Sequence, residues 1–272
     1  MVNNKMTKRE KHGWLTNKKR MQRREQAQTL TDKQVLHMIE KIDSLKKYSK
    51  LDSTTDKMLR LRDKALVAAM WIWFKRGNEI LRIKLGEIYY DEQELVVTLR
   101  IQKKSKRLKI CPECKTKNGY KSLYCKKCGI SLSETQPTII GIKAKPVTKR
   151  KSVDYPFCKY IIEWLDVLTT KDLEPTAWIF SRYNYFARAF QYNSESPLTV
   201  QRLDQILQKL DFTMTSSMFR YGGAEKYLRL GYTPFELKEI GDWSSSKMPE
   251  IYADRKGLTP SQKKFTDDIR MV

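Results

Sequence analysis

The sequence predicts an α+β fold that is mainly helical, with a small antiparallel β-sheet and a short cysteine-rich insertion. Three observations support this prediction. Several segments carry apolar residues at helical spacing behind capping residues, the first of them after Thr31. Residues 94–104 alternate in the manner of a strand and are rich in β-branched side chains. Four cysteines then follow in two CxxC pairs, before the later helices.

The composition is that of a globular protein. The chain has 272 residues, of which 40% are hydrophobic and 11% aromatic, enough for one or two domains with a substantial core. No run approaches the roughly eighteen apolar residues of a membrane span. The N-terminal segment is charged where a signal peptide would need an apolar stretch. We therefore expect a cytoplasmic protein.

The charge balance points to a polyanionic partner. Lys and Arg number 54 against 31 Asp and Glu, which gives a formal net charge of +23. This excess is far larger than solubility requires. A membrane surface is the competing polyanion, but the sequence has no strongly amphipathic helix or lipidation motif near a terminus. Nucleic acid is therefore the favoured partner, and no membrane association is expected.

The chain divides by composition into five parts. Residues 1–29 carry nine Lys or Arg against two Glu. This basic arm is either an ordinary solvated terminus or an arm that contacts phosphates. The remaining expected parts are a first part of the main domain, the cysteine-rich insertion, a second part of the main domain and a C-terminal tail, at residues 30–110, 111–135, 136–256 and 257–272.

The helices are expected where capping residues precede apolar periodicity. Thr31 and Gln34 have capping-box spacing, and a buried helix then runs over residues 56–74 before a turn at Arg76. Further helices are expected at residues 158–168 and 199–210, and after Thr233, where Pro234 and Glu236 complete a start signal.

The strands are expected on either side of the cysteines. In the segment 94–104, Val96, Thr98 and Arg100 alternate with apolar neighbours. Residues 138–145 and 149–156 read as two further strands that pair across a turn at Pro146.

Two CxxC pairs ten residues apart have the spacing of a metal site that closes around one ion. The four thiolates would be those of Cys111, Cys114, Cys125 and Cys128, and zinc is the expected ion. Disulfide bonds are the alternative, which a reducing compartment disfavours. Four cysteine ligands leave no open position for water, so we expect a structural zinc ribbon. Cys158 stands alone and is expected to be a small packed residue.

Three further stretches carry a resemblance. Arg76-Gly-Asn-Glu79 is similar to the pattern R-x-x-E, Ser217-Met-Phe-Arg220 to H-x-x-R, and Gly241-Asp-Trp243 is followed by Tyr252 nine residues after the tryptophan. In this order and spacing they resemble the catalytic domain of the tyrosine recombinases, or phage-type integrases, over about residues 30–256. The residues around Trp243 are most similar to the corresponding segment of archaeal and archaeal-virus integrases, and this similarity would place the chain in a mobile element.

The resemblance implies a DNA recombination activity. Arg76 and Arg220 would be the two catalytic arginines, which hold the charge growing on the phosphate. Tyr252 would be the nucleophile, forming a 3′-phosphotyrosyl link without metal or nucleotide. Trp243 stands where the family has His or Trp, and its indole N–H would reach the phosphate. The family's hairpin lysine, which donates a proton to the leaving oxygen, corresponds first to Lys145 and second to Lys143.

Ser217 stands where the family has its proton-transfer histidine, and this leaves two functions open. The first is a DNA integrase-type enzyme that acts on double-stranded DNA, self-associates on it and uses the zinc ribbon to extend the DNA-binding surface. The second is a catalytically weakened relative that binds DNA, because serine cannot shuttle a proton near neutral pH. A third possibility, a zinc-ribbon transcription factor, explains only the cysteines.

Overall fold

The computed structural model describes residues 30–45, 52–101, 106–140, 145–211 and 213–255. The basic arm 1–29, Lys143 and the tail 257–272 lie outside this part of the chain. The α-helices of the described part are α2 (Asp32–Ser44), α3 (Ser53–Trp73), α4 (Gly77–Leu81), α5 (Cys158–Thr169), α6 (Val200–Leu210), α7 (Ser216–Arg229), α8 (Pro234–Gly241) and α9 (Lys247–Arg255). The strands are β1 (Ile88–Tyr90), β2 (Glu94–Ile101), β3 (Lys106–Ile110), β4 (Lys117–Gly119), β5 (Thr138–Ile140), β6 (Lys145–Ser152), β7 (Arg182–Asn184) and β8 (Ala189–Gln191). The expected α+β class, mainly helical, is confirmed.

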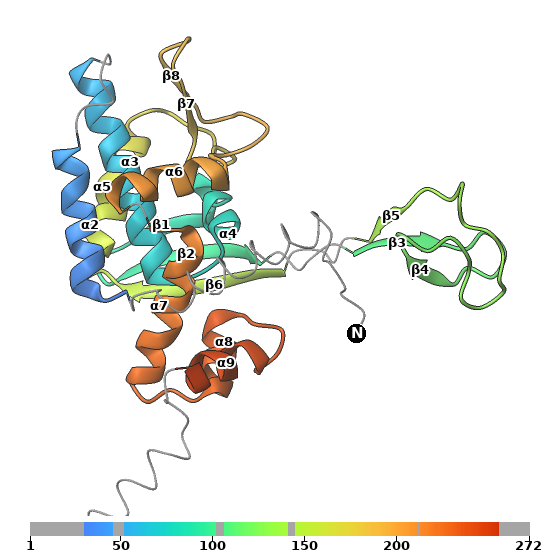
Figure 1. Ribbon diagram of the computed structural model, residues 1–272. Coiled ribbons are helices and arrows are strands. Elements are labelled where there is room, and N and C mark those ends of the chain that lie inside the picture. The colour runs from blue at the N-terminus through green and yellow to red at the C-terminus, as the bar shows by residue number, and fades with distance from the viewer. Residues whose placement is uncertain (1–29, 46–51, 102–105, 141–144, 212, 256–272) are drawn as a thin grey trace, which may run out of the picture.

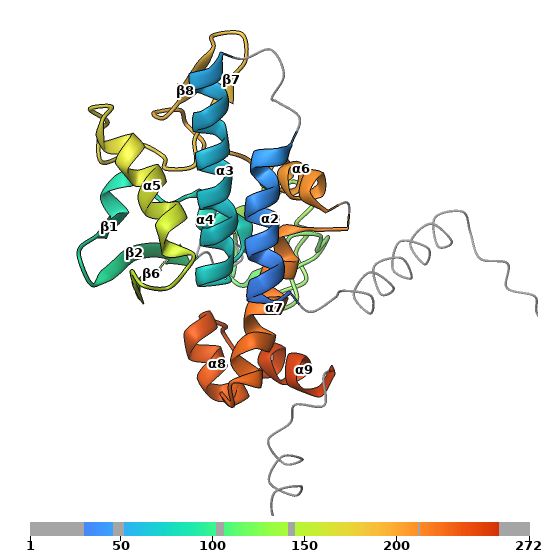
Figure 2. The same ribbon diagram turned by 90° about the vertical axis from the view of Figure 1, so that its left-hand side faces the viewer.

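Helix α3 is the centre of the main core. Its N-cap is Asp52, whose side chain accepts a hydrogen bond of 2.8 Å from the Thr55 backbone N–H. From Ala65 to Trp73 every side chain is buried, as expected for a helix that is surrounded by other elements. Figure 2 shows α3 between α2 and α5, and α7 crosses its C-terminal end. The same helix therefore fixes the position of the residues that follow it, beginning at Lys75.

The expected capping boxes are confirmed. Thr31 accepts from the Gln34 backbone N–H while the Gln34 side chain accepts from the Thr31 backbone N–H. Thr233 and Glu236 make the same exchange at the start of α8, with Pro234 at the first position. Each exchange satisfies N–H groups that a helix start leaves unpaired.

The three-stranded sheet has the order β1-β2-β6, and all its pairs are antiparallel. Strand β2 pairs with β6 from Ile101 opposite Lys145 to Glu94 opposite Ser152. The predicted pairing of residues 138–145 with 149–156 is therefore wrong. Pro146 lies inside β6, at a sheet edge where the missing N–H is tolerated, and Thr138–Ile140 pairs with β3 instead.

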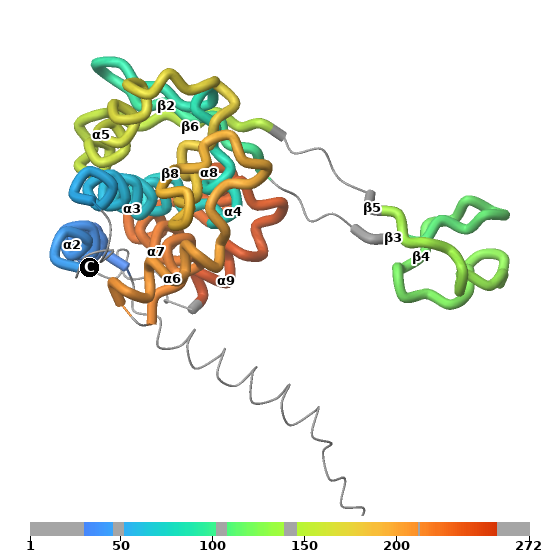
Figure 3. Tube along the Cα trace, turned by 90° about the horizontal axis from the view of Figure 1, so that it is seen from above, coloured from blue at the N-terminus to red at the C-terminus, as the bar shows by residue number. Residues whose placement is uncertain are grey.

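A second sheet has the order β4-β3-β5, and the four cysteines lie in the segments that connect its strands. Its buried apolar cluster consists of Cys111, Cys125 and Leu132, which is too little to stabilise a domain by burial alone. Figures 1 and 3 show these strands standing apart from the helices. The insertion leaves β2 and returns to β6, so it occupies the place of a hairpin turn between them.

The C-terminal helices form a smaller core against the end of α3. This C-terminal core consists of Phe74, Ala224, Leu228, Leu237, Trp243, Tyr252 and Ala253. Helix α7 approaches α3 closely because residue 223 is glycine: a Cβ there would lie 2.4 Å from the Cβ of Phe74. The contact sets the position of Arg220, which lies one turn earlier on α7. No helix in the described ranges is long and apolar enough to cross a membrane.

Candidate active site and metal centre

Glu79 brings the two predicted catalytic arginines together. Arg76 is the N-cap of α4, and its Nη1 lies 3.0 Å from Glu79 Oε1. Arg220 comes from α7, and its Nη1 lies 3.8 Å from Glu79 Oε2. The Glu79 side chain is buried, whereas that of Arg76 is 52% exposed. One carboxylate is thus shared by two guanidinium groups, which leaves a net positive charge on this group of three side chains.

The Arg220 guanidinium is buried and only partly satisfied. Its Nη2 donates to the Gly241 carbonyl at 3.2 Å, and its Cζ lies 4.3 Å from the centre of the Trp243 ring. Its Nη1 is buried without a hydrogen-bond partner in the described structure. Burial, together with the positive charge of Arg76, lowers the pKa of Arg220. A buried guanidinium N–H without an acceptor is costly, and an anion at this position would satisfy it.

Tyr252 lies in the same neighbourhood, on α9. Its ring meets that of Tyr221 edge-on at 5.2 Å and that of Trp243 at 5.9 Å. Only 8% of the residue is exposed. Tyr252 also lies close enough to Arg220 to interact with its charge. A negative charge on Tyr252 would raise the pKa of Arg220, which opposes the lowering by burial. Arg76, Arg220, Trp243 and Tyr252 are thus brought together from four segments.

The other predicted catalytic residues are Ser217 and the two candidate lysines, Lys145 and Lys143. Ser217 is exposed in the first turn of α7, where its hydroxyl lies 3.0 Å from that of Thr215. Lys145 begins β6 with its backbone opposite Ile101, and its side chain lies outside the described part of the structure. Lys143, the second choice, is outside the described residues altogether.

Three residues that the sequence analysis missed form a cluster behind Arg220. Lys75 Nζ donates to the Ile240 carbonyl at 2.8 Å and to the carboxylate of Asp242. Lys149, from β6, lies 3.2 Å from the same carbonyl and 3.1 Å from Asp242 Oδ2. Burial, reinforced by the positive charge of Lys149, lowers the pKa of Lys75 to about 8. Asp242 has a left-handed backbone, with φ of 52°, and caps α8.

The turn from Ile240 to Trp243 is therefore held by three elements of the main core. Lys75 extends from the end of α3, Lys149 from β6 and Arg220 from α7. These contacts fix Trp243, and through it the position of Tyr252. A lysine at the end of an apolar helix usually extends its charged group into solvent, so nothing in the sequence indicated that Lys75 would be buried. Its position directly before Arg76 was the one sign that it could lie near the site.

The four predicted metal ligands come together from the two segments that connect the strands of the second sheet. The sulfur atoms of Cys111, Cys114, Cys125 and Cys128 all lie within 4.8 Å of one another. Backbone N–H groups of Cys128 and then Lys127 lower the pKa of Cys125 to about 6, which favours a thiolate. The cysteines of the described part are free rather than paired in disulfides. This donor set fits a single metal ion.

Cys158 takes no part in this cluster. It is fully buried in the main core, and its thiol donates to the Ser152 carbonyl at 3.3 Å. Burial raises its pKa to about 11, as expected for a packed and unreactive thiol.

Comparison with solved structures identifies the fold. A post-cleavage complex of the XerH site-specific recombinase with palindromic difH substrate superposes with a TM-score of 0.53 at 13% identity, covering 89% of this chain and 53% of XerH. A pre-cleavage complex of XerH with difH gives 0.52 at 13% identity, with coverage of 82% and 49%. This chain thus spans about half the length of that recombinase. No protein-family model and no curated protein matches the sequence. The likeness shows a recombinase-type fold.

Proposed function

We propose that this chain is a tyrosine recombinase of the integrase type, which binds double-stranded DNA and cuts and rejoins its strands. The observation that carries the proposal is a series of contacts: Glu79 joins Arg76 to Arg220, the Arg220 guanidinium lies over the Trp243 ring, and that ring meets Tyr252. Each of these residues belongs to a motif that resembles the family. The fold is that of a site-specific recombinase solved with its DNA substrate.

The proposed chemistry is a phosphoryl transfer to the enzyme and back. The Tyr252 hydroxyl loses its proton to solvent water, and its oxygen attacks a DNA phosphorus, forming a 3′-phosphotyrosyl bond as the bond to the 5′-oxygen breaks. Arg76 and the unsatisfied Nη1 of Arg220 hold the nonbridging oxygens, where negative charge grows. Lys145 gives a proton to the departing 5′-oxygen. A 5′-hydroxyl then attacks the phosphotyrosine to rejoin a strand, so the energy of the broken bond is retained.

One observation favours a second function, that of a DNA-binding protein with weakened cleavage. Ser217 is at the position of the family's proton-transfer histidine, and it lies exposed beside Thr215. A positioned acid or base is worth about 10²–10⁴ in rate. The nucleophile at Tyr252 would be an unexplained residue in a protein that only binds, which is why we favour the enzyme.

The proposed role of the metal is structural. Zinc held by Cys111, Cys114, Cys125 and Cys128 would have four thiolate ligands and no open position, so it would supply folding energy to strands β3, β4 and β5 rather than chemistry. We expect the module, with its basic flanks, to extend the DNA-binding surface.

A suicide substrate tests the proposed enzyme. A pool of nicked duplexes with a randomised centre traps a covalent intermediate, because the short cleaved strand diffuses away before it is rejoined. Wild-type protein should give an adduct that survives denaturing electrophoresis, and Tyr252→Phe should give none. Tyr221→Phe is the matched control, since it changes the tyrosine that packs against Tyr252 and should keep the adduct. Binding without any adduct would support the second function.

A further inference from the structure

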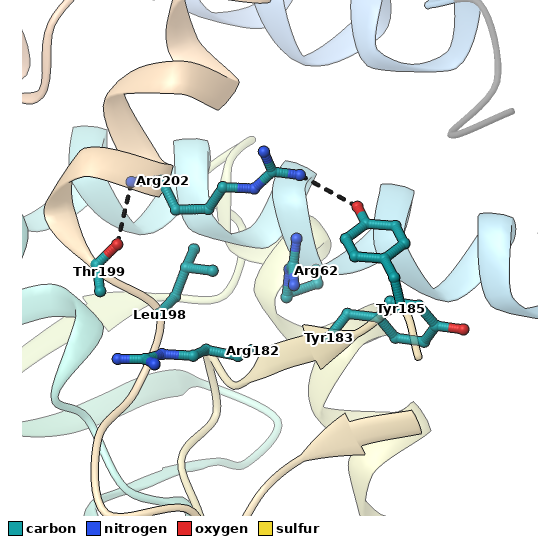
Figure 4. A pocket seen from close by; sticks show the side chains of 7 residues that line it. All are labelled: Arg62, Arg182, Tyr183, Tyr185, Leu198, Thr199 and Arg202. Atoms are coloured by element: carbon teal, nitrogen blue, oxygen red, sulfur yellow. Dashed lines mark hydrogen bonds between the residues drawn. The ribbon is translucent and has the colours of Figure 1, made fainter. Parts of the chain in front are cut away.

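An open pocket with three arginines lies on the main body, away from the candidate active site around Arg220 and Tyr252. It has a volume of about 210 Å³. Figure 4 shows that Arg62 comes from α3, Arg182 from β7 and Arg202 from the first turn of α6, and that the side chains of Arg182 and Arg202 run in opposite directions. Its wall is completed by Tyr183, Tyr185, Leu198 and Thr199.

The positive charge of this pocket is only partly neutralised. Arg62 is buried and pairs with Asp63, with Nη2 2.7 Å from Oδ1. Arg182 instead donates to neutral acceptors, the Pro197 carbonyl at 2.9 Å and the Ser196 hydroxyl at 2.7 Å. Arg202 donates likewise to the Gln205 side chain and the Tyr185 hydroxyl, each at 3.1 Å. Within the described residues neither Arg182 nor Arg202 has an ion pair, so both keep an unbalanced charge.

An aromatic hairpin stands beside these arginines. The ring of Phe190 lies 6.0 Å from that of the buried Trp164, Tyr183 meets Phe190 at 5.2 Å, and Tyr185 meets Tyr183 at 5.1 Å. This series ties the β7–β8 hairpin to the core. Phe186, at the tip of the β7–β8 hairpin, is 101% exposed. Burying a phenylalanine side chain is favourable by roughly 1.5–3 kcal/mol, so a partner that covered this ring would gain binding energy.

We infer that the Arg182–Arg202 pocket and the Phe186 tip form a second DNA-contact site, in which each of the two arginines contacts a backbone phosphate and the phenyl ring packs into the adjacent minor groove. Guanidinium forks without carboxylate partners suit a phosphate. A fully exposed apolar ring at the tip of the same hairpin suits a wedge against sugars or a base step. The net charge of +23 favours DNA over a protein partner for such a surface. The inference rests on the proposed function, since it concerns how the same DNA is held.

The salt dependence of DNA binding separates the two contacts. Binding of a fluorescent duplex of mixed sequence is measured by anisotropy against salt, in a Tyr252→Phe background so that no covalent product interferes. Arg182→Ala with Arg202→Ala should weaken binding and lower the slope of log affinity against log salt by about one unit for each phosphate contact that is lost. Phe186→Ala should weaken binding by roughly fivefold or more and leave the slope unchanged.

Lys64→Ala with Arg229→Ala is the matched control. It also removes two positive charges, but both are already paired, with Asp43 at 2.6 Å and Glu225 at 2.8 Å. The control should bind nearly as the parent protein does. An effect equal to that of the pocket variants would mean that only net charge matters, and would overturn the inference. Unchanged binding by the pocket and tip variants would also overturn it, and would leave a protein partner for this surface.

These outcomes are distinct from failure of the proposed function. If the parent protein binds no duplex at all, the recombinase proposal fails, and the second contact site fails with it. If the parent binds and the pocket variants bind equally, only the second contact site is lost. Thermal unfolding of each variant confirms that the folded state is retained, and the exposed Phe186→Ala change should leave it unaltered.

Discussion

Lys75 and Asp242 form a buried ion pair between the end of α3 and the turn that precedes α9, with the Lys75 side chain only 1% exposed. Lys149 approaches the same carboxylate from β6, and the positive Arg220 is nearby. The pair links the segment that carries Arg76 to the turn that carries Trp243. It therefore connects the segment of the arginine that we propose to hold the phosphate with the turn that leads to α9, the helix of Tyr252.

The pKa of Lys75 predicts a pH-dependent stability. Burial lowers it from 10.5 to about 8. Between these values the unfolded chain binds more protons than the folded one, so stability rises with pH. The free energy of unfolding of the wild type, minus that of Lys75→Met, should rise by about 2 kcal/mol between about pH 7.5 and about pH 9.5. Urea unfolding at several pH values measures this difference. A difference that does not change with pH would contradict the assignment.

The close approach of α7 to α3 predicts a large cost for one added methyl group. Gly223→Ala would place its Cβ 2.4 Å from the Cβ of Phe74, so one helix must move. We expect a loss of about 1–3 kcal/mol in the free energy of unfolding. Gly119→Ala is the control, because its nearest neighbour would be the Ser122 hydroxyl at 3.4 Å. Equal stabilities of the two variants would show that α7 packs less closely.

The contacts of the Arg220 guanidinium predict that its replacement slows cleavage without weakening DNA binding. In Arg220→Lys, an ammonium replaces the fork that now contacts Gly241, Glu79 and the Trp243 ring. The rate of adduct formation on a suicide substrate should fall by about 10²–10³, because one preorganised donor to the phosphate is lost. Affinity for the duplex should change little. A variant that cleaves at the wild-type rate would exclude Arg220 from the chemistry.

The exposed serine of α7 predicts a gain of function. Ser217→His restores a group that can transfer protons near neutral pH, and adduct formation should accelerate by up to about 10²–10⁴. Ser217→Ala is the comparison, and it should cleave at the same rate as the wild type because the serine hydroxyl transfers no proton. A large loss in Ser217→Ala would instead give the serine itself a role in cleavage.

The cysteine cluster predicts one zinc ion per chain. Replacement of zinc by cobalt should give the strong sulfur-to-metal absorption of four thiolate ligands, and Cys125→Ser should reduce both this absorption and the metal content. Cys158→Ser should bind metal as the wild type does, since Cys158 is buried away from the cluster. Metal content that depends on Cys158, or equal metal content in Cys125→Ser, would contradict the site.

The sequence predicted those features that local chemistry decides. The capping boxes at Thr31 and Thr233 depend on residues three apart, and both form as expected. The cysteine spacing likewise anticipated a cluster that could hold one ion. The pairing of the strands around the insertion was predicted wrongly, because strand pairing depends on residues that are far apart in the chain. Strand β6 pairs with β2 over eight residue pairs, across the whole insertion, rather than with the nearby residues 138–145.

The neighbours of the candidate site were also beyond prediction from the sequence. Lys75, Lys149 and Asp242 are far apart in the chain and carry no shared motif, and only the packing of α3, β6 and the turn after α8 joins them. The same holds for the role of Glu79, which the R-x-x-E pattern included but whose contact with Arg220 depends on the glycines of α7.

Mass spectrometry of the covalent adduct tests the central claim most directly. Trypsin digestion of protein trapped on a suicide substrate, followed by nuclease treatment, should yield residues 248–255 with a nucleotide on Tyr252, joined through the 3′-phosphate. A nucleotide on any other residue, or a 5′-phosphate link, would contradict the proposed chemistry.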